Sequence, residues 1–253
     1  MRLMFNAIQG SGAVDSRIPL IDTDVNIVFD GDSLTQGING AWTPTNDNDQ
    51  YYPNKVKDWL TPLSKSVSFF SNGISGKNLF EMLGDAATLI DPKLEPLKTN
   101  ICVVWEDVNS IYTGDRTGAQ TYSDMVQYVT DRKTAGWDYV FIMTTYWHRT
   151  PTNLWTFKSN PPTYIDISGI LIPALKAQCD IYYDAIYATA NPLWDAAYDL
   201  RNAPNIGGAY SQGWTQYPPT EDTYFKDYVH LQAAGYDIVA DAVINELIGK
   251  FFK

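Results

Sequence analysis

The sequence predicts a single α/β domain built on a parallel sheet. Short runs of β-branched and aromatic residues alternate with longer segments of helical periodicity, which is the order that βαβ units produce. A chain of 253 residues is long enough for one such domain with its own core and short for two. Its composition, 45% hydrophobic and 19% charged, is ordinary for a globular protein.

Five apolar runs are the predicted strands, and the periodic segments between them are the predicted helices. The strands are residues 25–29, 66–70, 101–105, 139–144 and 181–186. The helices are residues 51–63, 78–89, 117–135 and 164–178. A last helix is predicted between Leu231 and Leu247, where apolar residues recur at three- and four-residue steps and form a stripe to pack on the sheet. Residues 1–24 are less periodic, so we expect a lead-in or linker there and the domain in residues 25–253.

Charge and cysteine content exclude several classes of function. Acidic residues outnumber basic ones by 29 to 18, giving a net charge of −11, so neither nucleic acid nor an anionic membrane surface is an expected partner. No apolar run approaches the length of a membrane span, and we expect a soluble protein. No signal peptide is visible, which leaves the compartment unknown because a processed chain looks the same. Two cysteines, Cys102 and Cys179, cannot form a disulfide framework, and Cys102 is expected to be buried.

The first motif with chemical meaning is a glycine-flanked serine directly after the first predicted strand. Ser33 lies in the run from Gly31 to Gly37, at the carboxyl end of that strand. Ligands of open α/β sheets bind at the carboxyl ends of strands. The two glycines permit a sharp turn and a close approach to the backbone. Ser33 is therefore a candidate nucleophile.

A serine hydroxyl needs a base, so the sequence must also supply a histidine held by an acid. The chain has two histidines. His230 directly precedes the last predicted helix, and Asp227 lies three positions before it. Over one turn the two side chains can project to the same side, so that the carboxylate accepts the proton of imidazole Nδ1 and the other nitrogen faces Ser33.

These residues resemble the sequence blocks of the SGNH/GDSL hydrolase family. The run Gly31-Asp32-Ser33-Leu34 is similar to its first block, and Asp227 with His230 to its last. Gly76, after the second strand, matches the oxyanion-hole glycine, and Asn109, after the third, matches the asparagine of the third block. The resemblance covers residues 25 to about 248. It implies a flavodoxin-like three-layer α/β/α sandwich with a five-stranded parallel sheet in the order 2-1-3-4-5.

The third block departs from the family pattern. It usually reads Gly-x-Asn-Asp, whereas this chain has Asp107 in place of the glycine and Ser110 in place of the final aspartate. A carboxylate pointing at a developing oxyanion would oppose catalysis, so we expect Asp107 to point away.

The activity implied by the resemblance is ester hydrolysis through an acyl-enzyme. Ser33 would be the nucleophile, His230 the general base and acid, and Asp227 the acid that orients the imidazole. The oxyanion hole would consist of the backbone N–H groups of Ser33 and Gly76 and the side-chain amide of Asn109. No cofactor and no metal are expected. The acidic run at residues 47–49 lacks a full set of calcium ligands and is interpreted as solvated.

Each residue also has a structural interpretation. Ser33 could cap a helix, Asp227 and His230 could be a helix-start pair, and Gly76 and Asn109 could be ordinary loop residues. Their occurrence in the family's order, each at a strand end or before the last helix, favours the catalytic interpretation.

The expected substrate is a small-molecule or polysaccharide ester, most simply a carbohydrate carrying short acyl groups such as acetyl. Aromatic faces beside polar groups suit sugar rings. Candidate substrate contacts are His148, Trp147 and Asp32, and the alternative for His148 is a surface loop residue. The alternatives are a lipid or thioester acylhydrolase, or a non-catalytic glycan-binding module that kept the fold. Several aromatic residues are expected in rim loops, with a place in the core or in an interface as the alternative: Trp42, Tyr51, Tyr52, Tyr112, Trp147, Trp155, Tyr210, Trp214 and Tyr217.

Overall fold

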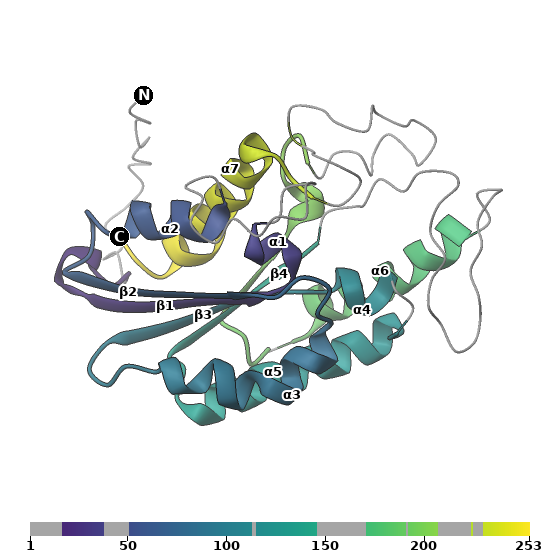
Figure 1. Cartoon of the computed structure of the whole chain (residues 1–253), viewed down its shortest axis with the longest axis horizontal. Helices are drawn as coiled ribbons and strands as arrows, with labels where there is room; N and C mark the ends of the chain where they lie inside the picture. Colours follow the sequence, from purple (N-terminus) through teal and green to yellow (C-terminus); the bar gives the residue numbers. More distant parts are fainter. Residues whose placement is uncertain are drawn as a thin grey trace.

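A five-stranded parallel sheet forms the centre of the computed structural model (Figure 1). The structure describes residues 17–37, 51–112, 115–145, 171–190, 192–206, 224 and 230–253. The strands lie in the order β2-β1-β3-β4-β5, which confirms the order implied by the family resemblance. Their bounds are Asp24–Gly31 (β1), Ser66–Gly73 (β2), Thr99–Trp105 (β3), Tyr139–Thr144 (β4) and Ala196–Asp199 (β5).

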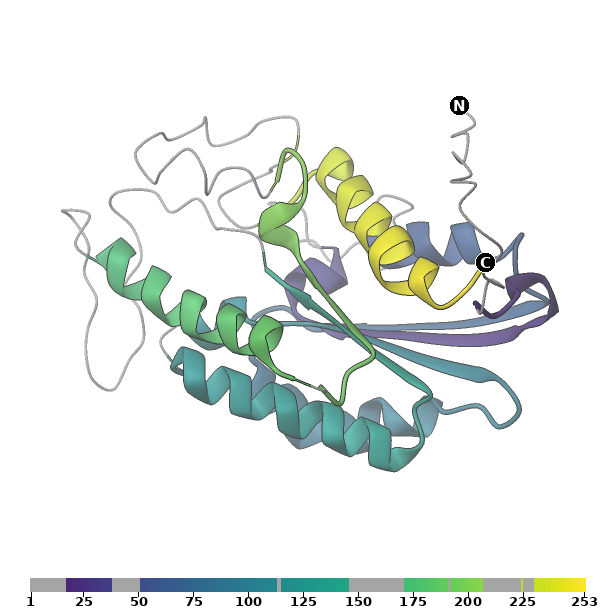
Figure 2. The same ribbon diagram turned by 180° about the vertical axis from the view of Figure 1, so that it is seen from behind.

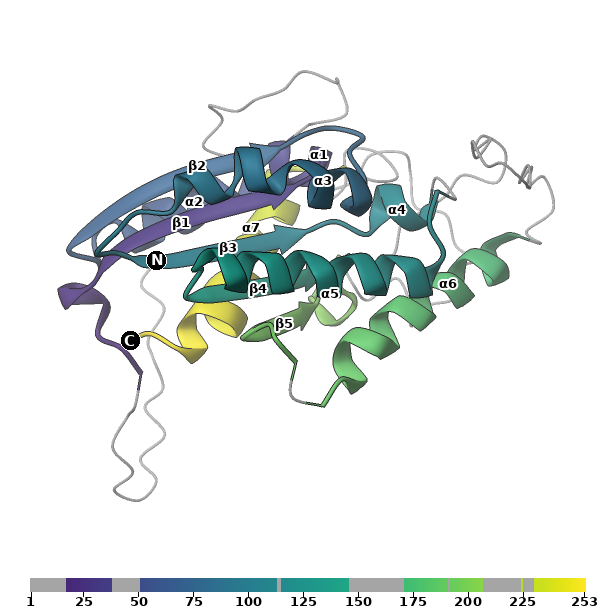
Figure 3. The ribbon, with the colours of Figure 1, turned by 90° about the horizontal axis from the view of Figure 1, so that it is seen from below.

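Helices cover both faces of the sheet and make it the middle of three layers (Figures 1 and 3). On one face lie α2 (Tyr52–Leu60) and α7 (Ala233–Ala242), the latter continued by a π-helical segment (Val243–Leu247) and a 3-10 turn (Ile248–Lys250). On the other face lie α3 (Leu79–Leu89), α5 (Gly118–Ala135) and α6 (Leu171–Ala188). Two short helices, α1 (Ser33–Gln36) and α4 (Val108–Tyr112), follow β1 and β3. The remaining 3-10 turns are Leu20–Asp22, Asp91–Lys93 and Leu200–Asn202.

The central strands are apolar on both faces because each face meets a layer of helices. Ile27 and Phe29 of β1 belong to the core beneath α2 and α7, whereas Val28 between them joins the core beneath α3, α5 and α6. Cys102 of β3 is buried in the second of these cores, as expected. Continuous apolar runs are the sequence signal of such strands, and this is why β1, β3 and β4 were predictable.

The fifth predicted strand, residues 181–186, is wrong. These residues lie inside α6, and the fifth strand of the sheet is β5, further along the chain. Tyr182, Tyr183 and Ile186 are buried while Ile181 is 46% exposed, which is the one-sided burial of a helix. Tyrosine and isoleucine favour strands, but packing against α5 decides the structure here. Residues 171–178 of the helix predicted at residues 164–178 form the first part of the same helix, and residues 164–170 lie outside the described part.

The described end of the predicted lead-in pairs with the C-terminus, and Figure 2 shows the C-terminal segment reaching it. Ile18 forms a parallel bridge with Phe252, and the backbone N–H of Lys253 donates to Ile18 at 3.0 Å. Leu20 is buried in the core with β1 and α7. Residues 17–23 are therefore packed against the domain. In the described ranges, none of the helices has the length and apolar character that crossing a membrane requires.

Helix α1 packs so closely on β2 that Gly73 has no room for a side chain. A Cβ atom on Gly73 would lie 2.1 Å from the backbone nitrogen of Gln36. We predict that Gly73→Ala lowers the free energy of unfolding by about 1–3 kcal/mol because α1 must shift. Gly84→Ala is the matched control, since a Cβ on that helical glycine meets nothing within 4 Å and alanine favours a helix. Urea unfolding measures both, and equal stability of the two variants would contradict the prediction.

Candidate functional site

Ser33 is the first residue of α1, where β1 turns sharply into the helix. The Asp32 carboxylate caps α1 by accepting from the backbone N–H of Leu34 at 2.8 Å. Gly31 is required at the turn, because a Cβ there would lie 2.6 Å from the carbonyl oxygen of Trp105. This local structure places Ser33 at the carboxyl edge of the sheet.

His230 reaches the same edge from the other end of the chain. Its Nε2 lies 3.1 Å from Ser33 Oγ, although the two residues are 197 positions apart. Ser33 is 6% exposed and His230 is 5% exposed, so water screens their interaction little. His230 immediately precedes Leu231, which is fully buried in the core, and α7 begins two residues later. With the proton on Nδ1, Nε2 accepts the serine hydroxyl proton, which is the arrangement a general base needs.

Three of the predicted site residues lie outside the described part of the chain. These are Asp227, His148 and Trp147. The role of Asp227 as the acid beside His230, and the substrate contacts of the other two, stay predictions.

Gly76 occupies a tight turn after β2, close to α1. Its φ angle is +79°, in the left-handed region that favours glycine. The turn is tied to the first motif by two bonds: the N–H of Ile74 donates to the carbonyl of Gly31 at 2.9 Å, and the N–H of Ser75 donates to Gln36 Oε1 at 2.9 Å. The segments carrying Ser33 and Gly76 are therefore held together.

The side chain of Asn109, on α4, bridges these two segments. Its Nδ2 donates to Asp32 Oδ2 at 2.9 Å and to the carbonyl oxygen of Lys77 at 3.1 Å. An amide nitrogen carries two hydrogens, so both have an acceptor. Donation to a bound oxyanion requires one of these bonds to open or to be shared, and the bond to Lys77 is the longer.

The two departures in the third block both have partners. The Asp107 carboxylate accepts from the backbone N–H of Thr145 at 2.9 Å and from the Thr145 hydroxyl. The Ser110 hydroxyl donates to Glu106 Oε2 at 2.7 Å. Sequence reasoning assigned no role to Glu106, which is fully buried directly after β3. The sequence did contain one signal for Glu106: it is an acidic residue directly after an apolar strand, in the block that carries Asn109.

For Tyr51 and Tyr52 the alternative of core residues holds, and not the expected place in the rim loops. Both are buried, and Tyr52 begins α2 with its ring centroid 5.4 Å from each of those of Phe29 and Trp105. The side chain of Tyr112 and the other aromatic residues predicted to line the rim lie outside the described part.

Solved structures of esterases have a similar fold. Axe2, an acetylxylan esterase from Geobacillus stearothermophilus, matches with a TM-score of 0.58 and 14% identity over 90% of this chain and 95% of that one. A lipase/acylhydrolase from Enterococcus faecalis matches with a TM-score of 0.55 and 16% identity, over 89% and 96%. The psychrotrophic esterase EstA from Pseudoalteromonas sp. matches with a TM-score of 0.55 and 13% identity, over 88% and 96%. The chain has the SGNH hydrolase fold.

The SGNH hydrolase fold was the one implied by the sequence blocks, and that prediction is confirmed. At identities of 13–16% the likeness establishes the fold alone. A search with models of protein families finds no match, and a search of curated proteins finds none either.

Buried carboxyl groups lie around Ser33, at the carboxyl ends of the strands. Burial raises the pKa of Asp32 to about 7, although the bond from Leu34 and the charge of His230 lower it. Burial likewise raises the pKa of Asp107 to about 6 against the bonds from Thr145. Burial raises the pKa of Glu106 as well, and the charge of Asp32 adds to the effect. In the described residues, no three side chains of His, Cys, Asp or Glu are grouped to hold a metal ion.

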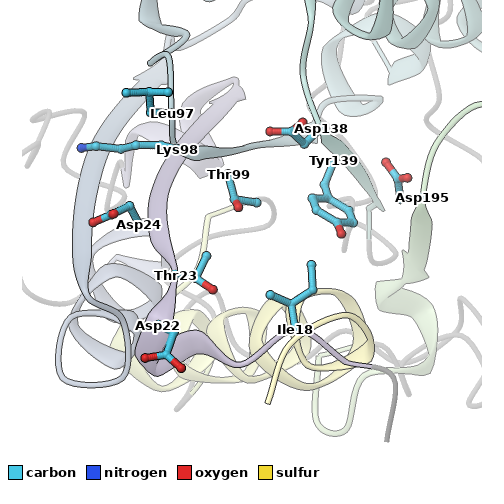
Figure 4. A pocket seen from close by; sticks show the side chains of 10 residues that line it. All are labelled: Ile18, Asp22, Thr23, Asp24, Leu97, Lys98, Thr99, Asp138, Tyr139 and Asp195. Atoms are coloured by element: carbon cyan, nitrogen blue, oxygen red, sulfur yellow. The ribbon is translucent and has the colours of Figure 1, made fainter.

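A hollow at the amino ends of the strands, opposite to the end that carries Ser33, is lined by residues at the strand starts (Figure 4). Three of its four acidic residues have local structural partners. Asp24 pairs with Lys65, Asp138 accepts from the N–H of Asn100, and Asp195 accepts from the N–H of Val140. These bonds fix strand starts, so we assign the hollow no chemistry. Its lining residues are Ile18, Asp22, Thr23, Asp24, Leu97, Lys98, Thr99, Asp138, Tyr139 and Asp195.

The buried carboxyls predict how stability depends on pH. Burial also raises the pKa of Asp30 to about 6, against bonds from Tyr128 and Asn72. Between the ordinary value of 3.8 and these raised values the folded protein holds more protons than the unfolded chain, so the free energy of unfolding falls as pH rises from about 4 to about 7.

We expect a loss of at least about 1 kcal/mol between pH 5 and pH 7.5, since one pKa unit corresponds to about 1.4 kcal/mol. Urea unfolding at the two pH values measures it. The variant Asp30→Asn, which removes one of these groups, should show a smaller loss. Stability that rises across this interval in the unsubstituted protein would contradict the prediction.

Proposed function

We propose that the chain is a serine esterase that cleaves carboxylic esters through an acyl-enzyme on Ser33. The observation that carries the proposal is the 3.1 Å contact between Ser33 Oγ and His230 Nε2 at the carboxyl edge of an SGNH hydrolase fold. A serine at a strand-to-helix turn with an imidazole in contact is the arrangement that nucleophilic catalysis of acyl transfer needs.

The proposed reaction has two steps. Ser33 Oγ attacks the ester carbonyl carbon while His230 Nε2 takes the hydroxyl proton, and the imidazolium then gives that proton to the leaving alcohol. Water, deprotonated by the same imidazole, next attacks the acyl carbon. The bond from that carbon to Ser33 Oγ breaks, the imidazolium returns its proton to Oγ, and the carboxylic acid leaves. Asp227 is the proposed partner of His230 Nδ1.

The proposed oxyanion hole is formed by the segments described above. The backbone N–H groups of Ser33 and Gly76 and the amide of Asn109 would donate to the tetrahedral oxyanion. The bonds that join Gly31 to Ile74, and Asn109 to Asp32, support this assignment because they hold these donors in one region before substrate arrives.

The proposed substrate is a carbohydrate that carries short acyl groups, most simply acetyl. Support comes from structurally similar proteins described as acetyl xylan esterases, among them Axe2 and AlAXEase. The similar lipase/acylhydrolase from Enterococcus faecalis supports the alternative of a lipid or thioester substrate. A non-catalytic glycan-binding module is the second candidate, favoured by the occupied N–H groups of Asn109.

Acyl-length preference and covalent labelling test the proposal. We expect hydrolysis of p-nitrophenyl acetate to exceed that of the decanoate in kcat/KM, and release of acetate from acetylated xylo-oligosaccharides. A fluorophosphonate should add one label per chain, as intact mass measures, because it reacts with an activated serine; EstA was likewise inhibited by monoethylphosphonate. The variant Ser33→Ala should lose both the label and the hydrolysis.

The matched control is Ser64→Ala, since the buried Ser64 hydroxyl has no hydrogen-bond partner among the described residues. This variant should keep both the label and the activity. A preference for the decanoate would overturn the carbohydrate assignment and favour the lipid alternative. An unsubstituted protein that is neither labelled nor active would overturn the esterase and favour the binding module.

A further inference from the structure

Glu106 is a fully buried carboxylate with no assigned part in the reaction, and it holds the start of α4. Its Oε1 accepts from the backbone N–H of Asn109 at 2.7 Å and from that of Ser110 at 3.2 Å. Its Oε2 accepts from the Ser110 hydroxyl at 2.7 Å. Glu106 thus receives three hydrogen bonds from two consecutive residues, one of which is the proposed oxyanion donor.

The same network reaches the segment that follows Gly76. The Ser110 oxygen that donates to Glu106 also accepts from the backbone N–H of Leu79, the first residue of α3, at 3.0 Å. The Asn109 amide donates to the carbonyl of Lys77 in that same segment. Ser110 therefore joins α4 to the start of α3, while the hydrogen bonds of Glu106 itself go to α4.

The hydrogen bonds of Glu106 stabilise both its own buried carboxylate and the short helix α4. Burying a carboxylate is costly unless several hydrogen bonds compensate for lost hydration. Helix α4 has five residues, too few to be stable without help from its surroundings. Glu106 supplies that help at the N-terminal end of the helix, where backbone N–H groups lack partners.

We propose that Glu106 is a positioning residue for the esterase reaction, holding α4 so that the Asn109 amide is presented between the Ser33 and Gly76 segments. The inference rests on the proposed function. Misplacement of a catalytic group by about 1 Å can cost about 100-fold in rate, so a residue that acts only through Asn109 can have a large kinetic effect.

A double-mutant cycle separates this role from general stabilisation. We expect Glu106→Ala to lower kcat about 10- to 100-fold with KM changed less than about 2-fold, because the lost interaction is made in the transition state. We expect Asn109→Ala to lower kcat about 100- to 1000-fold. In the Asn109→Ala background, Glu106→Ala should cost less than about 3-fold more, since its target is already gone.

Asp107→Asn is the matched control. Asp107 is the neighbouring buried acidic residue, and its carboxylate accepts from Thr145. Its contact with α4 is made by its backbone carbonyl, which accepts from the N–H of Ile111 and is kept in Asp107→Asn. We expect Asp107→Asn to lower kcat less than about 3-fold, and by the same factor in the unsubstituted protein and in the Asn109→Ala background. Ser110→Ala provides a milder probe if Glu106→Ala fails to fold. It should lower kcat about 3- to 10-fold in the protein that has Asn109, and less than about 3-fold in the Asn109→Ala background.

The outcomes distinguish the two proposals. Equal effects of Glu106→Ala with and without Asn109, or a full rate in a folded Glu106→Ala protein, overturn the positioning role and leave the esterase intact. If Glu106→Ala does not fold and Ser110→Ala does, the positioning role is overturned by a full rate in Ser110→Ala, or by the same loss of kcat with and without Asn109. An unsubstituted protein without hydrolysis or labelling overturns the esterase, and the positioning role with it.

Discussion

The contact between Ser33 and His230 is the interaction on which the rest of the account depends. The serine belongs to the first strand-to-helix turn and the histidine to the entry into the last long helix. They meet because β1 lies inside the sheet, between β2 and β3, and because α7 shares a hydrophobic core with one face of that strand. The fold therefore brings the proposed nucleophile and the proposed base together from distant parts of the chain.

A polar network at the carboxyl edge surrounds this contact. Asp32 caps α1 and accepts from Asn109, Glu106 caps α4, and Ser110 links α4 to α3. Each carboxylate is buried and would be costly without these bonds. The network explains how a third block that departs from the family pattern keeps an ordered structure: Ser110 pairs with Glu106, and Asp107 with Thr145.

The sequence predicted most of the fold because the central strands are buried on both faces. The missed strand is β5, at the edge of the sheet. Its four residues are mostly half-buried and form no apolar run, so the sequence pattern does not reveal it. The tyrosine-rich run at residues 181–186 carries the residue types of a strand, yet it is helical and packs against α5, a tertiary contact that residue types do not reveal.

The candidate site was predictable where chemistry restricts residue type. A serine mechanism needs a histidine, and the chain offers two, so Ser33 and His230 could be paired without coordinates. Glu106 could not be found that way, because its importance lies in burial and in bonds to backbone N–H groups, which residue identity does not reveal. The same limit explains Tyr52, a tyrosine next to a polar stretch that packs in the core.

The rate at which a fluorophosphonate modifies Ser33 in the variant His230→Ala tests the central claim most directly. The account predicts a second-order rate constant at least about 1000-fold below that of the unsubstituted protein, because the hydroxyl loses the base that its attack requires. Equal urea midpoints for the two proteins would show that the fold is kept. Modification of Ser33 at the unsubstituted rate in His230→Ala would contradict the account.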